Sequence, residues 1–502
     1  PCRTFFRREI GERTEGMSFR EAALEVNYWC AQEATYHCTD DRTLSALAVY
    51  RRGNGRCGEE SVFTVNALRS VGVPARQVYA PKWSHCDDNH AWVEIWCDGS
   101  WYFLGACEPE EILNKGWFTN ASSRAMMVHS RVFDTMIPEG EVIGKDGMVT
   151  MLNELKRYAL TKEITVSVKD SHGKPAEGAE VSFEVLNYSE YAPIAELKTD
   201  SLGKVSLTTG LGSIHISARM YADGEWLHAE NSMDTKTEDC CEICLMPVGK
   251  EKGIFYEEWT EIDMIAPHDA PVNKDMPTSE QKERGSRRLA EANAYREQKV
   301  RNLSNLECRK FLEKETGDSS MRKKLLEVLT EKDRTDCISQ EHLKSALPYE
   351  KNMDADIFVP YVLNPRVDDE VLQKYRKTIL EQLSEEEKNM LQKEPAKIWK
   401  WIEDKIVSSP EKERSSVITT PSGCLKTGTG SLLSKKILFV AMARTLGIPA
   451  RLNPHDRSME YMKNGKFIPV SAETEKKASI LLKASADTQW KYFQNWSIAK
   501  LE

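Results

Sequence analysis

Residues 55–61, Gly-Arg-Cys-Gly-Glu-Glu-Ser, stand directly before an apolar helical pattern, and they decide the fold that the sequence predicts. A Gly-Val-Pro ends the pattern, which predicts a helix over 57–71 with Cys57 at its start. Residues 90–96, His-Ala-Trp-Val-Glu-Ile-Trp, are typical of a strand that opens with His90. A thiol at a helix start and an imidazole at a strand start are the parts of a cysteine nucleophile with its base.

The position of Cys57 carries the chemical argument. A free thiol titrates at about pH 8.5, and the thiolate is the nucleophile. A helix N-terminus carries about half a positive charge and unpaired N–H donors, so it is expected to favour the thiolate and to hold an oxyanion. Gly55 and Gly58 leave room for a substrate backbone. His90 is expected to take the thiol proton and return it to the leaving amine.

The surrounding residues resemble a known family. After the first stretch come Gly-Val-Pro-Ala-Arg at 72–76, Asp-Asn-His-Ala-Trp-Val-Glu at 88–94 and a strand that opens at Trp101. Together they resemble the core of the transglutaminase-like superfamily over residues 36–132. The resemblance implies a papain-like fold with a Cys-His-Asp arrangement, as in cross-linking transglutaminases, peptide:N-glycanases and bacterial cysteine proteases. It also implies that the thiol is the nucleophile and the imidazole is the base.

The third member of this arrangement is the difficulty. The family has Asp four residues after the Trp that opens the next strand, and that position here is Gly105. Glu108 is the nearest carboxylate, and we expect it to orient the imidazole. Asp87 and Asp88 are alternatives, and so is a backbone carbonyl. Without an orienting group the imidazole tautomer is poorly fixed, and the rate falls by orders of magnitude.

The second oxyanion donor and the substrate groove have several candidates. Family members take this donor from an upstream side chain, which here is one of Trp29, Tyr36 and Asn54. Residues in loops next to the site are expected to line a groove, because binding residues concentrate on such loops. Packing at the edge of the fold is their alternative role. The groove candidates are Trp83, His85, Asp88 and Trp117.

A second copy of the pattern lies near the C-terminus. Residues 447–451 are Gly-Ile-Pro-Ala-Arg, and they align with the Gly-Val-Pro-Ala-Arg of the first copy. In this alignment Leu432 takes the place of Cys57, and Asp456 takes the place of His90. We therefore predict a second copy that does not catalyse. Two possible replacements lie nearby in the wrong register, Cys424 and His455.

The rest of the chain divides into further modules. Alternating strands and turn signals over 160–250 predict an immunoglobulin-like β-sandwich, a spacer or docking module without chemistry. Residues 277–412 are rich in Glu, Lys, Arg and Leu and are expected to be mainly helical. The predicted fold class is therefore α+β and multidomain. A papain-like core is expected at 1–150, and a degenerate core, truncated at the end of the chain, at 413–502.

Composition restricts the partners. The net charge of −9 over 502 residues argues against nucleic acid as the main partner. No run approaches the roughly 20 apolar residues that a membrane span needs. The Cys-Glu-Ile-Cys at 241–244 has no second Cys or His pair at zinc spacing, so neither a metal nor a cofactor is expected.

Compartment and oligomeric state stay open. The first residue is Pro1, which allows for a signal peptide already removed, and the predicted sandwich favours a place outside the cytoplasm. The 13 cysteines without a pairing pattern favour the opposite.

Three functions follow, in order of preference. The first is a cysteine hydrolase of amide bonds that acts through a thioester, with a peptide, a glycopeptide or a cell-wall peptide as substrate. The second is a binding protein that kept the fold after losing efficient chemistry, because the Asp is missing and the second copy lacks both catalytic residues. The third is a Gln–Lys acyl transferase. Hydrolysis is favoured over transfer because it is the default when water reaches the acyl-enzyme.

Overall fold

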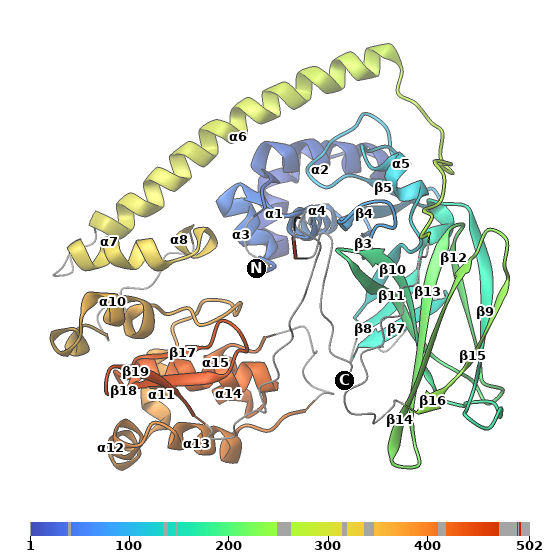
Figure 1. Ribbon diagram of the computed structural model, residues 1–502. Helices are drawn as coiled ribbons and strands as arrows, with labels where there is room; N and C mark the ends of the chain where they lie inside the picture. Colours follow the sequence, from blue (N-terminus) through green and yellow to red (C-terminus); the bar gives the residue numbers. More distant parts are fainter. Residues whose placement is uncertain are drawn as a thin grey trace.

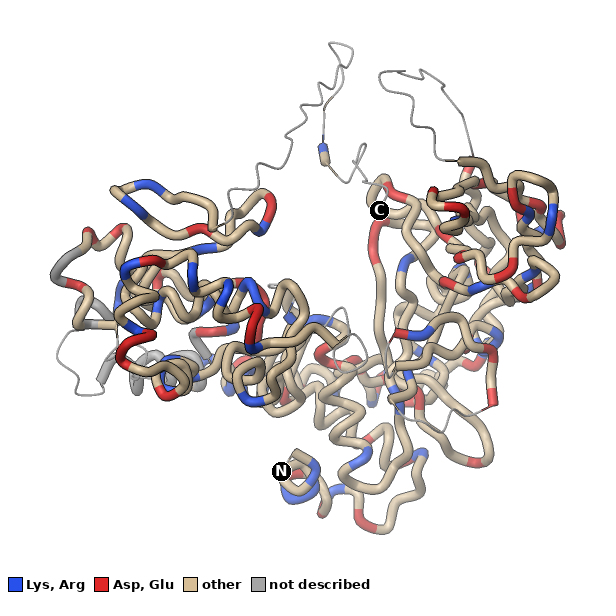
Figure 2. Tube along the Cα trace, turned by 90° about the horizontal axis from the view of Figure 1, so that it is seen from below, with Lys and Arg blue, Asp and Glu red and all other residues tan. Residues whose placement is uncertain are grey.

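The structure is a computed structural model in which three regions are joined by a long helix (Figure 1). The N-terminal core lies at the top centre of the view, a β-rich module lies to its right, and a second mixed core lies to its lower left. Residues of both charges are interspersed along the chain (Figure 2). The structure describes residues 2–38, 42–133, 139–146, 149–247, 263–313, 319–335, 346–409, 418–470, 489 and 491–492.

The N-terminal core is built around helix α4 (Cys57–Ser70). This helix packs against three others, and the buried ring of Phe63 is part of their shared apolar core. Helix α2 (Phe19–Glu33) is capped by Ser18, which forms a capping box with Glu21. The other helical elements of this core are α1 (Cys2–Ile10), the 3-10 turn η1 (Glu12–Thr14), α3 (Ala46–Arg52) and α5 (Thr119–Ser123).

A six-stranded antiparallel sheet carries His90 at the start of one strand. The strand order is β5-β4-β3-β6-β8-β7, and α4 packs against β3 and β4. The hairpin turn between β4 and β5 has positive φ at Asp98 and Gly99, and Asp-Gly is a pair of residues that such turns favour. The strands are β3 (Ala75–Ala80), β4 (His90–Cys97), β5 (Ser100–Leu104), β6 (His129–Val132), β7 (Val142–Asp146) and β8 (Val149–Asn153). A short parallel pair, β1 (Thr35–Tyr36) and β2 (Asn54–Gly55), precedes α4.

The β-rich module follows a 3-10 turn, η2 (Leu155–Arg157). Its two sheets have the strand orders β11-β10-β13-β14-β16 and β12-β9-β15, and alternate side chains of both share one apolar core. Cys241 and Cys244 lie in β15, and neither forms a disulfide. The strands are β9 (Thr161–Lys169), β10 (Glu180–Asn187), β11 (Glu190–Lys198), β12 (Lys204–Gly210), β13 (Ser213–Ala222), β14 (Glu225–Asp234), β15 (Cys240–Cys244) and β16 (Met246–Pro247).

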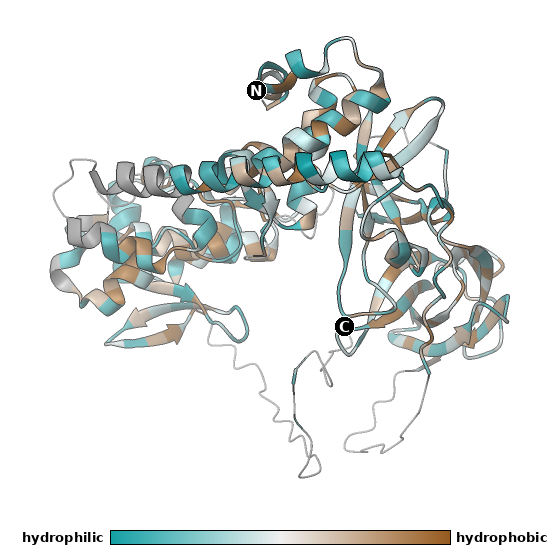
Figure 3. Cartoon of the chain, turned by 90° about the horizontal axis from the view of Figure 1, so that it is seen from above, coloured by the Kyte–Doolittle hydropathy of each residue, from teal (hydrophilic) through white to brown (hydrophobic). Residues whose placement is uncertain are grey.

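Helix α6 (Ser279–Glu313) runs along α2 and ties the helical region to the N-terminal core. Arg288 donates to Glu25 at 2.5 Å and stacks on Tyr28 with its guanidinium 3.6 Å from the ring centre. Figure 3 shows the helix as largely hydrophilic, so these polar contacts are what hold it. Within the described residues, no helix is long and apolar enough to cross a membrane.

The remaining helical elements are short. Residues 376–393 form two helices rather than one, because Ser384 caps a new helix and interrupts the first. The elements are α7 (Ser319–Val328), α8 (Glu331–Thr335), the 3-10 turn η3 (Leu347–Asn352), α10 (Ala355–Phe358), the π-turn η4 (Val359–Leu363), α11 (Arg376–Gln382), α12 (Glu385–Lys393) and α13 (Lys397–Lys405).

The C-terminal core repeats the geometry of the first. Helix α15 (Leu432–Thr445) has the same length as α4 and begins at Leu432, which matches Cys57. Arg451 pairs with Glu460 at 2.7 Å, as Arg76 pairs with Glu94. The elements of this core are α14 (Pro421–Thr427), α15, β17 (Ala450–Leu452), β18 (Met459–Lys463) and β19 (Lys466–Pro469), and its hairpin turn is Asn464–Gly465.

When the hairpin of β18 and β19 is aligned with the hairpin of β4 and β5, Asp456 takes the position of His90, in the turn before β18. Cys424 is buried inside α14, and His455 is exposed in the turn, so neither is at a catalytic position. The second core therefore lacks both the thiol and the imidazole.

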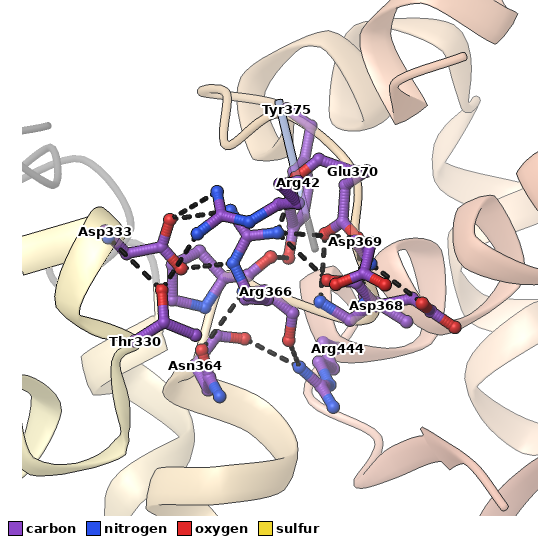
Figure 4. Close-up of polar contacts among 12 residues, drawn as sticks. Arg42, Thr330, Asp333, Asn364, Arg366, Asp368, Asp369, Glu370, Tyr375 and Arg444 are labelled. Atoms are coloured by element: carbon purple, nitrogen blue, oxygen red, sulfur yellow. Dashed lines mark hydrogen bonds and ion pairs between the residues drawn. The ribbon is translucent and has the colours of Figure 1, made fainter. Parts of the chain in front are cut away.

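A buried polar network joins the two cores through α8. Asp333 lies between the guanidinium groups of Arg42 from the first core and Arg366 from the segment before α11 (Figure 4). Arg444 of α15 donates to the carbonyl oxygens of Asn364 and Arg366 at 2.8 and 2.6 Å. The network is continuous from the segment before α4 to the centre of the second core.

Candidate active site

Cys57 is the first residue of α4, and its sulfur lies beside the start of β4. The backbone N–H groups of Ala91 and Gly58 lie close enough to the sulfur to lower the pKa of the thiol. Because Ala91 follows His90 directly in β4, the sulfur lies at the end of the strand that carries His90. Gln77 of β3 donates to the carbonyl oxygen of Gly58 at 2.9 Å and so holds the first turn of the helix.

The thiol of Cys57 is protonated at neutral pH, contrary to the expectation from the helix start. Burial is the largest influence and raises the pKa, and the charges of Glu60 and Asp88 raise it further. A helix N-terminus stabilises a charge by about 0.3–1 kcal/mol. Burial shifts a pKa by as much as about 3–5 units. Desolvation of the sulfur therefore outweighs the helix dipole.

The imidazole of His90 is enclosed by aromatic rings. Its centre lies 4.9 Å from the ring centres of Trp117 and Phe118 and 5.6 Å from that of Trp92. Burial lowers the pKa of His90 to about 4, so the ring is neutral at pH 7 and able to accept a proton. Among the described residues, none forms a hydrogen bond with its buried Nε2.

The carboxyl group of Glu108 fills the space that a side chain at Gly105 would need. A Cβ added at Gly105 would lie 2.9 Å from Glu108 Oε2 and 3.0 Å from Glu108 Cβ. Cys107 has φ of +59°, and the tight turn pairs Glu108 with Gly105 in a β-bridge. The carboxyl group is thus supplied by Glu108, three residues after Gly105, beside the position where the resemblance implies an aspartate.

Trp117 lies against both Glu108 and His90. Its indole Nε1 donates to Glu108 Oε2 at 2.8 Å, and its side chain is largely exposed. Burial raises the pKa of Glu108 to about 7, while the indole bond lowers it. The carboxyl group is therefore bound to Trp117 rather than to the imidazole, and it titrates close to neutral pH.

Two aromatic candidates belong to the apolar core. Trp29 is buried and packs against Phe6, Tyr50 and Phe63. Trp83 is also buried and stacks on Trp92, with ring centres 6.4 Å apart. The packing role holds for both, because large aromatic rings contribute most when they are fully enclosed.

The other candidates are Tyr36, Asp88, Asn54 and His85. Tyr36 is exposed, and desolvation of its hydroxyl, followed by the charges of Cys38 and Cys57, raises its pKa. Asp88 is exposed, and its charge adds to the burial that raises the pKa of the Cys57 thiol. Asn54 lies three residues before Cys57 in the sequence. Its buried Oδ1 accepts no hydrogen bond from any described residue. His85 packs against Trp83, and burial lowers its pKa.

Glu60 is a buried carboxyl group that the sequence reasoning missed. It is almost fully buried one helical turn after Cys57, and burial raises its pKa well above the ordinary value. The charges of Cys107 and Glu108 raise it further. The i,i+3 spacing from Cys57 was the available signal, because residues at this spacing share one face of a helix.

The protonation state of Cys57 gives a first prediction. Alkylation of Cys57 by iodoacetamide is expected to require a higher pH than alkylation of free cysteine, because only the thiolate reacts and burial raises the pKa of this thiol. The rate is measured by peptide mapping of Cys57, with free cysteine alkylated in parallel as the standard. A plateau reached below pH 7 would show a thiolate already formed in the resting protein.

Comparison with known proteins bears on this site. A family model of the transglutaminase-like superfamily matches residues 6–106 and 377–458. No curated protein matches the chain. One solved structure, described as the structure of a streptococcal ancillary pilin, aligns at 8% identity and a TM-score of 0.16. That alignment covers 34% of this chain and 61% of the pilin chain.

The family match confirms the resemblance drawn from residues 36–132, and it confirms a second, partial copy of the core. Cys57 and its neighbours lie inside the first matched segment, and Leu432 lies inside the second. The two matched segments, residues 6–106 and 377–458, thus belong to the transglutaminase-like superfamily.

Proposed function

We propose that this protein is a cysteine hydrolase that cleaves amide bonds through a thioester on Cys57. The observation that carries the proposal is the closeness of the Ala91 N–H group to the Cys57 sulfur, because it places the thiol beside the strand start that bears His90. The superfamily match supports a cysteine-dependent reaction of this class.

The reaction proceeds in two halves. The Cys57 sulfur attacks the carbonyl carbon of the amide while its proton passes to the neutral imidazole of His90. The imidazolium then protonates the leaving amine, the C–N bond breaks, and a thioester remains. Water adds to the thioester, gives a proton to His90, and the C–S bond breaks to release the acid and the thiol.

The neutral resting pair suits this sequence of proton transfers. Burial disfavours the charged forms of both groups, so the proton is expected to pass to the imidazole as the sulfur attacks the carbonyl carbon and not before. The N–H groups at the start of α4 are the donors for the oxyanion. We propose a peptide, a glycopeptide or a cell-wall peptide as the substrate.

A second candidate function is a binding protein on this fold with weak or no catalysis. Two observations favour it. Nε2 of His90 has no hydrogen-bond partner among the described residues, and burial raises the pKa of Cys57. Catalytic hydrogen bonds are often incomplete before substrate binds, so the same observations fit a resting hydrolase.

Capture of the acyl-enzyme tests the proposal. The protein is mixed with peptide, glycopeptide and cell-wall stem-peptide libraries, quenched in acid, and mapped by mass spectrometry. We expect an acyl adduct on Cys57, equal in mass to the substrate without its leaving amine. The exposed thiols of Cys38 and Cys86 are internal controls that stay unmodified. Absence of any Cys57 adduct and of any released amine would leave the binding protein as the function.

Transfer to amines is measured in the same reactions. A fluorescent primary amine is added, and its incorporation is compared with the release of free acid. Acid as the main product supports hydrolysis, and amide formation in excess of acid would assign a Gln–Lys acyl transferase instead.

A further inference from the structure

A turn of the β-rich module reaches the loop that precedes His90. Asn187 is the last residue of β10, and it is 1% exposed. Its Nδ2 lies within hydrogen-bond distance of three carbonyl oxygens of the N-terminal core, those of Trp83 at 3.0 Å, Cys86 at 2.9 Å and Asp88 at 3.2 Å. One side-chain amide from the β-rich module therefore binds both ends of loop 83–88.

The next residue of the turn adds a second tie. The backbone N–H of Tyr188 donates to Asp87 Oδ1 at 2.7 Å. The ammonium group of Lys82 lies 5.6 Å from the centre of the Tyr188 ring. The turn thus contacts the loop through the side chain of one residue and through the backbone and ring of the next.

The backbone of this turn is unusual for its sequence. Tyr188 and Ser189 both have left-handed φ, 53° and 57°, as a type I′ turn requires. Such turns favour Asn-Gly or Asp-Gly, because residues with a Cβ are disfavoured at positive φ. Non-glycine residues persist in this conformation where surrounding contacts fix them. The contacts with the loop are contacts of that kind.

These ties add to other contacts of the loop, such as the hydrogen bond from Ser84 Oγ to the carbonyl oxygen of Arg124 at 3.0 Å. Residues 83–88 lie between β3 and β4 and have no sheet partner. Two backbone bonds close the loop on itself, Trp83 N–H to Asp88 O at 3.0 Å and Asp88 N–H to Cys86 O at 2.9 Å. The Asp88 carbonyl oxygen accepts from both Trp83 and Asn187, and it stands two residues before His90.

We propose that Asn187 is a positioning residue of the active site: it fixes loop 83–88 and, through it, the start of β4, which carries His90. The β-rich module is then part of the catalytic unit rather than a spacer. The role in turnover rests on the proposed function, because it takes His90 as the base. The holding of the loop does not depend on that function.

Hydrogen exchange in the full chain tests the proposal directly. Asn187→Asp keeps the shape of the side chain but turns its donor into an acceptor that faces three carbonyl oxygens. We expect the amides of the loop to exchange at least about tenfold faster in this variant and in Asn187→Ala. The matched control is Asn231→Ala, because Asn231 donates to Cys241 Sγ inside the module and does not contact the loop. Its loop exchange is expected to equal that of the wild type.

A variant on the other side of the contact covers the case in which Asn187 variants do not fold. Asp87→Ala removes the acceptor of the Tyr188 N–H from an exposed position of the loop. We expect a smaller rise of exchange in the same peptide. Wild-type exchange in both Asn187→Asp and Asp87→Ala would overturn the proposal.

Turnover supplies the second readout. With the substrate found by acyl-enzyme capture, kcat is expected to fall by about tenfold in Asn187→Asp while KM changes less, because positioning of the base affects the chemical step. Faster loop exchange with unchanged kcat would overturn the positioning role. If no substrate is turned over by the wild type, the proposed function fails, and the exchange experiment still decides whether Asn187 holds the loop.

Discussion

Replacing Glu108 with glutamine is expected to lower kcat by about 10²–10⁴-fold, because loss of the group that orients a catalytic imidazole has this scale of effect. The geometry that carries this expectation is the position of the carboxyl group, 2.9 Å from the Cβ that an aspartate at Gly105 would have. Orientation of His90 requires Glu108 to leave the Trp117 indole when substrate binds. Steady-state kinetics on the captured substrate measures the loss.

Transfer of the acid to its usual position is the sharpest control. The double variant Gly105→Asp/Glu108→Ala removes the carboxyl group that would collide with a side chain at 105 and offers the family's aspartate there. We expect it to recover at least about tenfold of the kcat lost in Glu108→Ala. Glu110→Gln serves as the neighbouring control, since the residue is only half-buried and Trp117 donates to Glu108 instead. Equal kcat in wild type and Glu108→Gln would exclude Glu108 as the orienting acid.

The pH profile separates a catalytic role of Glu108 from a structural one. Burial raises its pKa to about 7, so the carboxylate forms as pH rises through about 7. The wild-type rate is expected to rise across that range, and the rise is expected to be absent in Glu108→Gln. An identical pH profile in both proteins would assign the rise to another group.

Replacing Lys332 with methionine is expected to lower the free energy of unfolding by about 3–5 kcal/mol, because it leaves a buried carboxylate without its partner. The ammonium group of Lys332 lies 3.0 Å from Glu59 Oε1, and both side chains are fully buried. Glu59 also accepts from the backbone N–H of Arg56 at 2.7 Å and of Leu44 at 2.8 Å, which holds the start of α4. The variant is thus expected to loosen the helix that bears Cys57. Urea unfolding of the N-terminal core measures the change.

A double-mutant cycle isolates the buried pair. Glu59→Gln alone and the double variant with Lys332→Met are compared with the wild type. The double variant is expected to be more stable than the Lys332→Met single variant, because no charge is then left unpaired. The exposed Lys324 of α7 provides the control substitution, Lys324→Met, with an expected change within about 0.5 kcal/mol. A loss below about 1 kcal/mol in Lys332→Met would show that water reaches Glu59.

Several elements of this protein could be predicted because their signals are local. Helix α4 begins at Cys57 and β4 begins at His90, since periodicity and the glycine and proline that follow are properties of neighbouring residues. The equal lengths of α4 and α15 follow from the Gly-x-Pro-Ala-Arg repeat in the same way. The helix break at Ser384 could not be predicted from the sequence, because serine occurs both as a helix cap and on the exposed face of a helix.

The sequence by itself determined the resemblance to the superfamily in both copies of the core, and it predicted a nucleophile with its base in the first copy and their loss in the second, because each is encoded in short spacings that the backbone converts into fixed geometry. The tertiary structure decided what surrounds them. Desolvation keeps the Cys57 thiol protonated, and a turn after Gly105 brings Glu108 to the place of an aspartate. Asn187 contacts the loop that precedes His90, and Lys332 pairs with Glu59 in the helix that begins at Cys57. Both side chains come from segments far away in the sequence. Burial and contacts between residues far apart in the chain depend on how whole modules pack, and no local pattern carries that information.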